Sequence, residues 1–213
     1  QGLTTPYTVA VDINGNEQTG TGILALSTFG PVTGGLGYFN NQNIDKDIAG
    51  ANITPGALGS FVRLDARSLR LTGGEDLYVA TVQGDLDFVK LEAWYLGMQD
   101  TFNSYTLAAT SNIDLAENAK LGLEARYVNL KLDQDAANRI NSNTLNTETK
   151  NDMFRFAVDG KFSIVNARLA YTMTDKNGGL TAVDQDAKNT SLGWFITSNG
   201  VPDAKYWQAA LGA

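Results

Sequence analysis

The chain contains 213 residues with a formal net charge of −7 at pH 7, and it has neither cysteine nor histidine. These missing residue types exclude disulfides, thiolate or imidazole metal ligation, and Ser-His-Asp or Cys-His catalysis. The negative charge argues against a nucleic acid partner, which requires a basic surface. No apolar run reaches the roughly 20 residues of a membrane helix, but a membrane-spanning strand needs only about 9–11 residues, half of which can be polar.

The first half of the chain predicts strands separated by turns and one long loop. Residues 1–18 read as a loop. Expected strands follow over 19–27, 32–39, 61–71, 76–83 and 86–96. Phe29-Gly30-Pro31 and Gly84-Asp85 are typical of tight turns. Residues 40–58 read as a polar loop rich in glycine and asparagine.

The second half continues in the same way. We expect strands over 104–112, 119–132, 154–162 and 165–173, with a compact turn at 115–118 and a tight joint at Ser163-Ile164. Residues 133–151 read as a long polar loop. From residue 175 onward the chain reads mostly as loop, with a strand at 192–197 and an amphipathic segment at 203–211.

Four of these strands alternate apolar and polar residues with strict period two. Because successive side chains point to opposite sides of a strand, each segment has one apolar face and one charged face. A soluble sheet covers its apolar face with a second layer, whereas lipid covers that face in an outer-membrane barrel. The apolar faces carry Val89, Leu91, Ala93 and Tyr95; Ala119, Leu121, Leu123, Ala125 and Tyr127; Phe154, Phe156, Val158, Gly160 and Phe162; and Val165, Ala167, Leu169, Tyr171 and Met173.

The connection lengths favour the barrel. The joints near Gly30, Gly84, Glu117 and Ile164 are tight, whereas the connections at 40–58, 133–151 and 175–203 are long and polar. Outer-membrane barrels combine short periplasmic turns with long outer loops in this manner.

The aromatic residues favour the same interpretation. Tyr95, Tyr127 and Tyr171 each lie at the far end of an apolar face, and Trp94 stands beside Tyr95. Such positions are typical of an aromatic girdle at the membrane interface. The general preference of aromatic residues for strands is the alternative explanation.

Three motifs point to other functions, and the first two fail on their context. Gly20-Thr21-Gly22-Ile23-Leu24-Ala25 matches a dinucleotide-binding pattern, but a turn and not a helix follows it. Asp12, Asn14 and Asn16 resemble the start of an EF-hand loop, but Glu17 and Ile23 stand where glycine and glutamate are needed. The repeats Asp133-Gln134-Asp135 and Asp184-Gln185-Asp186 read as solvated loops, with calcium binding as the alternative.

The charged strand faces supply the candidate pore-lining residues. In a soluble protein they would form a solvated face, whereas in a barrel they would line the lumen and set its ion selectivity. The candidates are Arg63, Arg67, Lys90, Glu92, Lys120, Glu124, Arg126, Arg155, Asp159, Lys161 and Arg168.

Several segments carry a family resemblance. They are Gln1-Gly2-Leu3, Pro6-Tyr7-Thr8, Gly20-Thr21-Gly22, residues 153–160 and Leu169-Ala170-Tyr171. In order and spacing they resemble the major outer-membrane porin family of Campylobacter-type bacteria, over nearly the whole chain. The resemblance implies an antiparallel transmembrane β-barrel of about 16–18 strands. Residues 1–213 would then be one incomplete domain, with strands missing before residue 1 and after residue 213.

The resemblance also implies partners and a site. It implies a homotrimer in the bacterial outer membrane, in contact with lipid, that passes ions and small hydrophilic solutes by diffusion. It further implies an acidic constriction that can bind Ca²⁺, for which the nearest candidates are Asp12, Asp45 and Asp47. No cofactor is required.

Our leading hypothesis is therefore a non-enzymatic porin channel, and the acidic balance of the chain indicates a mild cation preference. The alternative is a soluble or surface-attached β-sandwich that binds carbohydrate or a partner protein through its long loops. A hydrolase with paired carboxylates is a third hypothesis, although no carboxylate stands in a distinctive sequence context.

Overall fold

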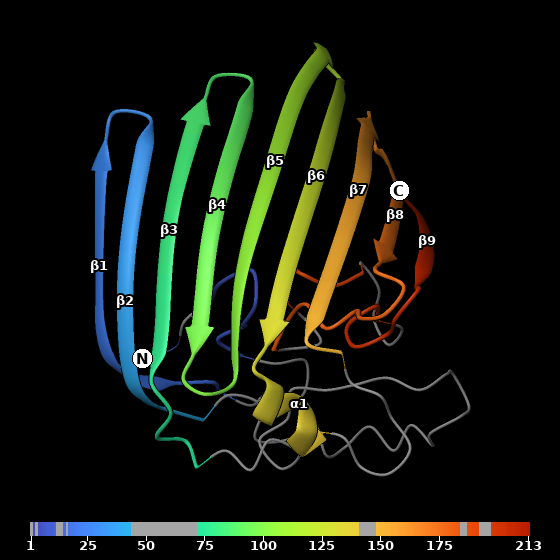
Figure 1. Ribbon diagram of the computed structural model, residues 1–213. Coiled ribbons are helices and arrows are strands. Elements are labelled where there is room, and N and C mark those ends of the chain that lie inside the picture. The colour runs from blue at the N-terminus through green and yellow to red at the C-terminus, as the bar shows by residue number, and fades with distance from the viewer. Residues whose placement is uncertain are drawn as a thin grey trace.

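The computed structural model describes residues 2, 4–11, 15, 17–43, 72–140, 148–183, 187–191 and 197–213. These residues form one antiparallel sheet in which each strand pairs with the next along the chain (Figure 1). One short helix, α1 (Gln134–Ile140), follows the sixth strand. The strands are β1 (Gly20–Phe29), β2 (Val32–Gln42), β3 (Leu77–Leu86), β4 (Val89–Met98), β5 (Phe102–Ala116), β6 (Ala119–Leu132), β7 (Lys150–Phe162), β8 (Val165–Thr174) and β9 (Lys205–Gly212).

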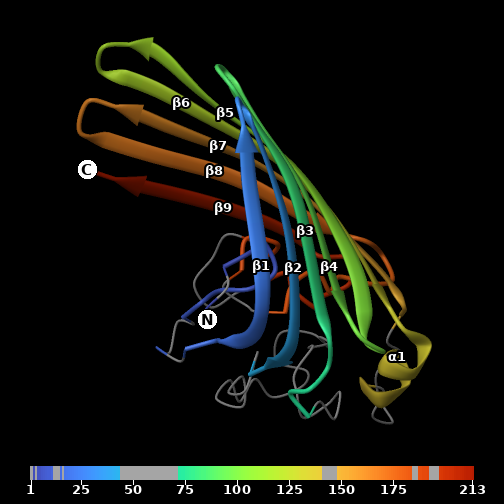
Figure 2. The ribbon, with the colours of Figure 1, turned by 90° about the vertical axis from the view of Figure 1, so that its left-hand side faces the viewer.

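The sheet is curved and open. It bends so that the described residues before β1 and between β8 and β9 lie on its concave side (Figure 2). The outer edges of β1 and β9 pair with no further strand in the described part of the chain. The predicted antiparallel all-β fold is confirmed, with a sheet that does not close on itself.

The predicted alternation separates the two faces as expected. The convex face exposes large apolar side chains such as Ile23, Leu107 and Leu169 on every strand except β6, where Leu121 and Leu123 are half-buried. The four predicted apolar faces all lie on this side, because the register pairs their residues directly across neighbouring strands. Among the described residues there is no second sheet that could cover this face, as a β-sandwich would require.

The polarity of both faces inverts near the end of the sheet that carries the long connections. In β6 the convex residues are apolar up to Tyr127, but Asn129 and Lys131 follow beyond it. On the concave side of the same segment, Leu130 and Leu132 are buried. Each face of the strand therefore meets a different environment on the two sides of Tyr127.

A hydrophobic core fills the concave side beyond this inversion. It joins the strands to α1 and to the two segments that fold inward, and Trp94 packs against it. Its members are Tyr7, Phe39, Leu77, Val79, Leu96, Met98, Phe102, Val128, Leu130, Leu132, Ala136, Ala137, Met153, Leu180 and Val183.

The connections at one end of the sheet are all short turns, whereas those at the other end are long, except for the short turn of residues 99–101 between β4 and β5 (Figure 1). The tight turns at Gly30, at 117–118 and at Ser163-Ile164 occur as predicted, and Gly30 and Ser163 adopt positive φ angles of 55° and 56°. Two-residue hairpins favour such backbone angles.

The predicted Gly84-Asp85 turn is wrong. Gly84 pairs with Leu91 and Asp85 with Lys90, and the chain reverses after Leu86 instead. No atom lies close to where a side chain of Gly84 would be, so this glycine fits within the strand. The hydrogen bonds between β3 and β4 therefore continue past Gly84 to the end of β3.

Other predicted boundaries also change. The 133–151 loop contains α1, the 203–211 segment is strand β9, and β5 reaches Ala116. The predicted strand at 61–71 and most of the one at 192–197 lie outside the described residues. In the described part of the chain, no helix has the length and apolar character needed to cross a membrane.

Candidate functional site

The predicted pore-lining residues that can be located all face the concave side of the sheet. Thr110 of β5 pairs with Lys90 on one side and with Glu124 on the other, so the three lie in one row across β4, β5 and β6. Ala108 lies in the same way between Glu92 and Arg126. The register likewise pairs Lys120 with Lys161, Arg126 with Arg155, and Asp159 with Arg168. Arg63 and Arg67, and the predicted constriction residues Asp12, Asp45 and Asp47, lie outside the described residues.

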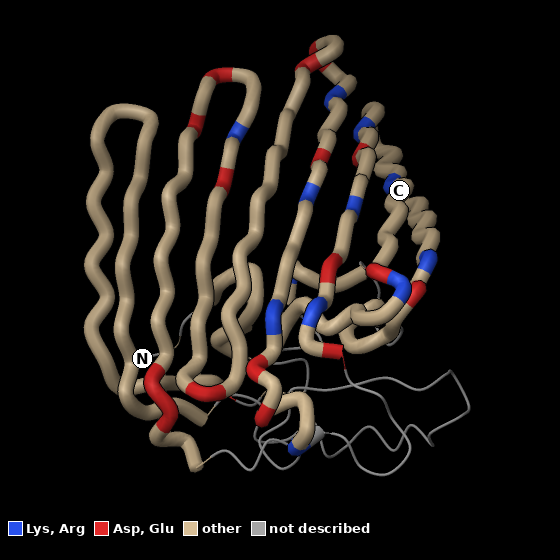
Figure 3. The backbone as a smooth tube through the Cα atoms, in the orientation of Figure 1, with Lys and Arg blue, Asp and Glu red and all other residues tan. Residues whose placement is uncertain are grey.

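The charged residues are unevenly distributed around the sheet. They lie on β3 to β9, whereas β1 and β2 carry none (Figure 3). On the concave face basic and acidic side chains are nearly balanced. The basic ones are Lys90, Lys120, Arg126, Arg155, Lys161 and Arg168, and the acidic ones are Asp85, Glu92, Asp114, Glu124 and Asp159.

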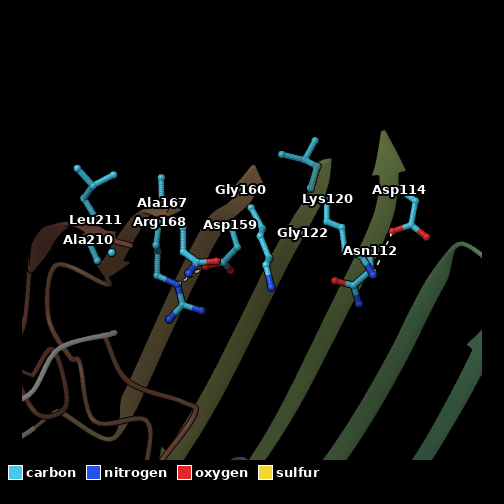
Figure 4. Close-up of a pocket in the computed structure, with 14 residues that line it drawn as sticks. Asn112, Asp114, Lys120, Gly122, Asp159, Gly160, Ala167, Arg168, Ala210 and Leu211 are labelled. Atoms are coloured by element: carbon cyan, nitrogen blue, oxygen red, sulfur yellow. Dashed lines mark hydrogen bonds and ion pairs between the residues drawn. The ribbon is translucent and has the colours of Figure 1, made fainter. Parts of the chain in front are cut away.

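An open charged hollow lies at the short-turn end of β5 to β9 (Figure 4). In it Arg168 Nε donates to Asp159 Oδ1 at 2.5 Å, and Lys120 Nζ lies 3.5 Å from Asp114 Oδ1. Leu211 points away from these side chains, toward the convex side. All four charged side chains are at least 41% exposed, so the two ion pairs contribute only about 0–1 kcal/mol each to stability.

A second charged cluster is buried, nearer the middle of the sheet. Glu124 Oε1 accepts hydrogen bonds from Arg155 Nε at 2.9 Å and Nη2 at 2.5 Å, and from Arg126 Nε at 3.5 Å. The Arg126 and Arg155 side chains are only 2% and 1% exposed. Two buried guanidinium groups thus share one carboxylate, whose own side chain is 22% exposed.

This cluster binds an inward-folded segment, residues 187–191. Arg155 Nη1 donates to the carbonyl oxygens of Lys188 and Thr190, both at 2.5 Å. Hydrogen bonds to a charged donor are stronger than neutral ones. Arg126 and Arg155 therefore face the concave side as predicted, but they contact protein and not an open lumen.

Asn189 is the centre of the contact between this segment and the strands. Its side chain accepts from Arg126 Nη1 at 3.2 Å and donates to Thr106 Oγ1 at 2.7 Å. Its backbone N–H donates to the Pro6 carbonyl at 2.9 Å, and its own carbonyl accepts from Thr181 Oγ1 at 2.5 Å. The residue is fully buried, so every one of these bonds forms away from water.

Tyr7 attaches the N-terminal segment at the same place. Its hydroxyl accepts from Thr106 Oγ1 at 2.8 Å, and its carbonyl accepts from the Val183 N–H at 3.1 Å. Burial raises the pKa of Tyr7 to about 12, so it stays neutral at physiological pH. The segments 4–11, 180–183 and 187–191 are thus held together against β5, β6 and β7.

Sequence reasoning missed Tyr7, Thr106 and Asn189 as members of this network. Tyr7 and Asn189 lie in segments that read as polar loops, and no local pattern places either beside a strand. The sequence does contain one indication that protein segments fold onto the concave side of the sheet. Leu96 and Leu130 interrupt the polar faces of their strands, which indicates protein rather than water on the concave side there.

The convex face carries a band of aromatic side chains at the inversion of polarity. The predicted Tyr95, Tyr127 and Tyr171 belong to it, joined by Tyr38, Tyr78, Tyr105 and Trp207. We call these seven residues the girdle. Ring centroids lie 5.4 Å apart for Tyr38 and Tyr78, 6.2 Å for Tyr105 and Tyr127, and 4.6 Å for Tyr171 and Trp207.

The girdle hydroxyls bind polar groups on the side of the long connections. Tyr38 Oη and Tyr78 Oη donate to the two Asp76 carboxylate oxygens, and Tyr127 Oη donates to Asp152 Oδ1. Tyr95 Oη donates to Asn103 Oδ1. Trp94 is not part of the girdle, because it lies on the concave side with its indole N–H on Glu92.

Within the described residues, no three acidic side chains approach closely enough to hold a metal ion. Asp133 and Asp135, considered as calcium ligands, lie at the start of α1, where the Asp133 carbonyl accepts from the Ala137 N–H.

No protein-family model matches the chain, and no curated protein matches its sequence. Solved structures do match. The chain superposes on OpdK, an outer-membrane protein of Pseudomonas aeruginosa, with a TM-score of 0.74 and 13% identity over 99% of this chain and 53% of that one. The chain has the fold of an outer-membrane porin barrel.

Two further structures give the same result. OpdL of Pseudomonas aeruginosa matches with a TM-score of 0.73 and 14% identity, over 97% of this chain and 52% of that one. OccAB2 of Acinetobacter baumannii matches with a TM-score of 0.67 and 16% identity, over 99% of this chain and 50% of that one. The chain therefore spans about half the length of the solved structures that it matches.

Proposed function

We propose that this chain is part of the wall of a channel in the bacterial outer membrane, through which ions and small hydrophilic solutes diffuse. The observation that carries this proposal is the convex apolar face, which ends at the girdle and turns polar beyond it. Lipid explains both features, since hydrocarbon covers apolar side chains and aromatic rings mark its boundary. A solvated surface explains neither, and no bond is made or broken in a passive channel.

In the membrane the short turns face the periplasm and the long connections face the outside. The exposed edges of β1 and β9 pair there with strands of the same polypeptide that precede and follow this chain. Unpaired backbone N–H and C=O groups are too costly in hydrocarbon for a sheet to remain open. This supports a larger barrel, of which residues 1–213 form one incomplete domain.

The segments 4–11, 180–183 and 187–191 form the narrow part of the channel. They are fixed to the concave wall through Asn189, Tyr7 and Arg155, and they occupy the lumen near the girdle. The open hollow around Asp159 and Arg168 then lies on the periplasmic side of the constriction. The aqueous path is lined by Lys90, Glu92, Lys120, Lys161, Asp159 and Arg168. The constriction is supported by Arg126, Arg155 and Glu124.

The mild cation preference remains a proposal supported by the net charge of −7. Since basic and acidic side chains nearly balance on the concave face of the described strands, we attribute the preference to the connections. The proposed source of the cation preference is the set Asp12, Asp45 and Asp47, which are also the proposed Ca²⁺ ligands. The pore is further proposed to be lined by Arg63 and Arg67. Membership of the Campylobacter-type porins and the homotrimer rest on the sequence resemblance alone.

Planar-bilayer recording of the full polypeptide tests the proposal. We expect stepwise ion conductance and a reversal potential that indicates a mild preference for cations. Charge reversal at Asp45 and Asp47 should shift that reversal potential toward anions. Absence of conductance from protein that folds in detergent would refute the channel, and an unchanged reversal potential would remove the two aspartates from the constriction.

A further inference from the structure

Two lysines stand directly opposite each other on the convex face, beyond the girdle. Lys131 of β6 pairs with Lys150 of β7, and both side chains are exposed. Like charges in such a cross-strand pair repel each other. In the part of the chain that the structure describes, neither ammonium group has a carboxylate within ion-pair distance. The pair therefore lacks a visible counter-charge.

A carboxylate that neighbours this pair in β7 is already bound elsewhere. Asp152, two residues from Lys150, accepts hydrogen bonds from Tyr127 Oη and from Asn129 Nδ2, both at 2.7 Å and both on Oδ1. These donors lie on the membrane side of the lysines. A third lysine on the convex face, Lys205, lies 3.7 Å from Asp203 and has its own partner.

The distance of the two lysines from the girdle, measured along the strands, indicates where they lie relative to the membrane. Lys131 follows Tyr127 by four residues on the same face, which corresponds to about 13 Å along a strand. If the tyrosine ring marks the edge of the hydrocarbon, the two ammonium groups lie at the level of the lipid headgroups. The outer orientation of this end follows from the long connections.

We propose that Lys131 and Lys150 together bind the phosphate of a lipid headgroup in the outer leaflet. One phosphate between the two ammonium groups removes their repulsion and supplies the missing counter-charge. Asn103, which pairs with Lys131 on the side of β5, offers an amide at the rim of this site. The inference rests on the proposed function, because it requires that lipid meets the convex face.

The structure supplies a matched control. Lys120 and Lys161 also stand directly opposite each other on β6 and β7, and both are exposed, but they face the concave side. A K120Q/K161Q variant removes the same two charges from the same two strands. If lipid binding depends only on the total charge of the protein, K131Q/K150Q and K120Q/K161Q will lose the same affinity.

The experiment uses the full polypeptide in detergent micelles, titrated with lipid A, a glucosamine disaccharide lipid that carries phosphates. We expect K131Q/K150Q to weaken binding about 30-fold, as two headgroup contacts predict, and K120Q/K161Q to bind as the parent does. Lipid A without its phosphates should bind as weakly to the parent as intact lipid A binds to K131Q/K150Q.

Each contrary result overturns the proposed site. The site is refuted if K131Q/K150Q binds lipid A as tightly as the parent does, or if K120Q/K161Q loses as much lipid affinity as K131Q/K150Q. Displacement of the lipid by an equal concentration of inorganic phosphate would assign the lysines to a free anion instead. Conductance of the same preparation separates the two proposals: a conducting channel with unchanged lipid affinity refutes only the lipid site, whereas a folded protein without conductance refutes the channel.

Discussion

Arg126 and Arg155 lie directly opposite each other on β6 and β7, and both bind the same oxygen of Glu124. Buried and of like charge, they would repel each other strongly without this carboxylate between them. The remaining N–H groups of Arg155 reach the carbonyls of the 187–191 segment, so the same arrangement that neutralises the wall also holds the constriction. This relationship leads to the first prediction.

Replacing Glu124 with glutamine should destabilise the protein by about 3–5 kcal/mol, because it leaves two buried guanidinium groups without a counter-charge. Asp159→Asn is the control, since its pair with Arg168 is exposed and worth about 0–1 kcal/mol. Urea unfolding of the full polypeptide in detergent measures both. Equal small effects of the two variants would contradict the buried role of Glu124.

Asn189→Ala should widen the channel. The substitution leaves the buried Arg126 Nη1 without its amide partner and Thr106 Oγ1 without its donor, at about 1–3 kcal/mol for each unsatisfied group. The 187–191 segment then separates from the wall, and we expect a larger and noisier single-channel conductance. Asn166→Ala, an exposed amide on the concave face of β8, should leave the conductance unchanged. Loss of stability at constant conductance would show that Asn189 supports the fold without defining the constriction.

The connection that enters β3 should depend on pH through Glu75. Burial opposes its ionisation, but the backbone N–H groups of Thr72 and Gly73 and the Thr72 hydroxyl bind the carboxylate and hold the pKa of Glu75 below its ordinary 4.5. The stabilisation is therefore complete above pH 4.5 and disappears as the pH falls through the lowered pKa. Amide hydrogen exchange at Thr72 and Gly73 measures it.

The exchange of these two amides, corrected for the intrinsic pH dependence, should accelerate at acidic pH in the parent. A Glu75→Gln variant should show no such step, because its amide does not titrate. A step of equal size in that variant would assign the transition to another group.

The convex face offers a test of what covers it. Leu169→Arg places a charge on an apolar side chain that is 52% exposed, and this should cost about 2–4 kcal/mol if hydrocarbon surrounds it. Asn166→Arg, on the concave and water-filled side of the same strand, should cost at most about 1 kcal/mol, through repulsion from Lys161 directly opposite. Folding titrations in lipid vesicles compare the two. Equal stability of both variants would mean that water, and not lipid, meets the convex face.

The strands were predictable because their signal is local. The alternation in β6, β7 and β8 depends only on which neighbour points to which side, and it correctly assigned Leu123, Phe156 and Leu169 to the convex face. The tight turn near Gly30 follows from a residue that accepts positive φ, and the one near Ser163 from the break between two alternating segments. The misplaced turn at Gly84-Asp85 shows the limit of this reasoning, since a glycine can equally occupy a strand position that faces open space.

The sequence by itself thus determined an antiparallel sheet with one apolar and one charged face, because period-two patterning acts between adjacent residues. Only the tertiary structure decided which charges meet water and which are buried. Arg155 and Arg168 look alike in the sequence, yet Arg155 is covered by a segment more than 30 residues away, whereas Arg168 stays open beside Asp159. Contacts over such sequence distances depend on the curvature of the sheet and the path of its connections, and no local pattern encodes either.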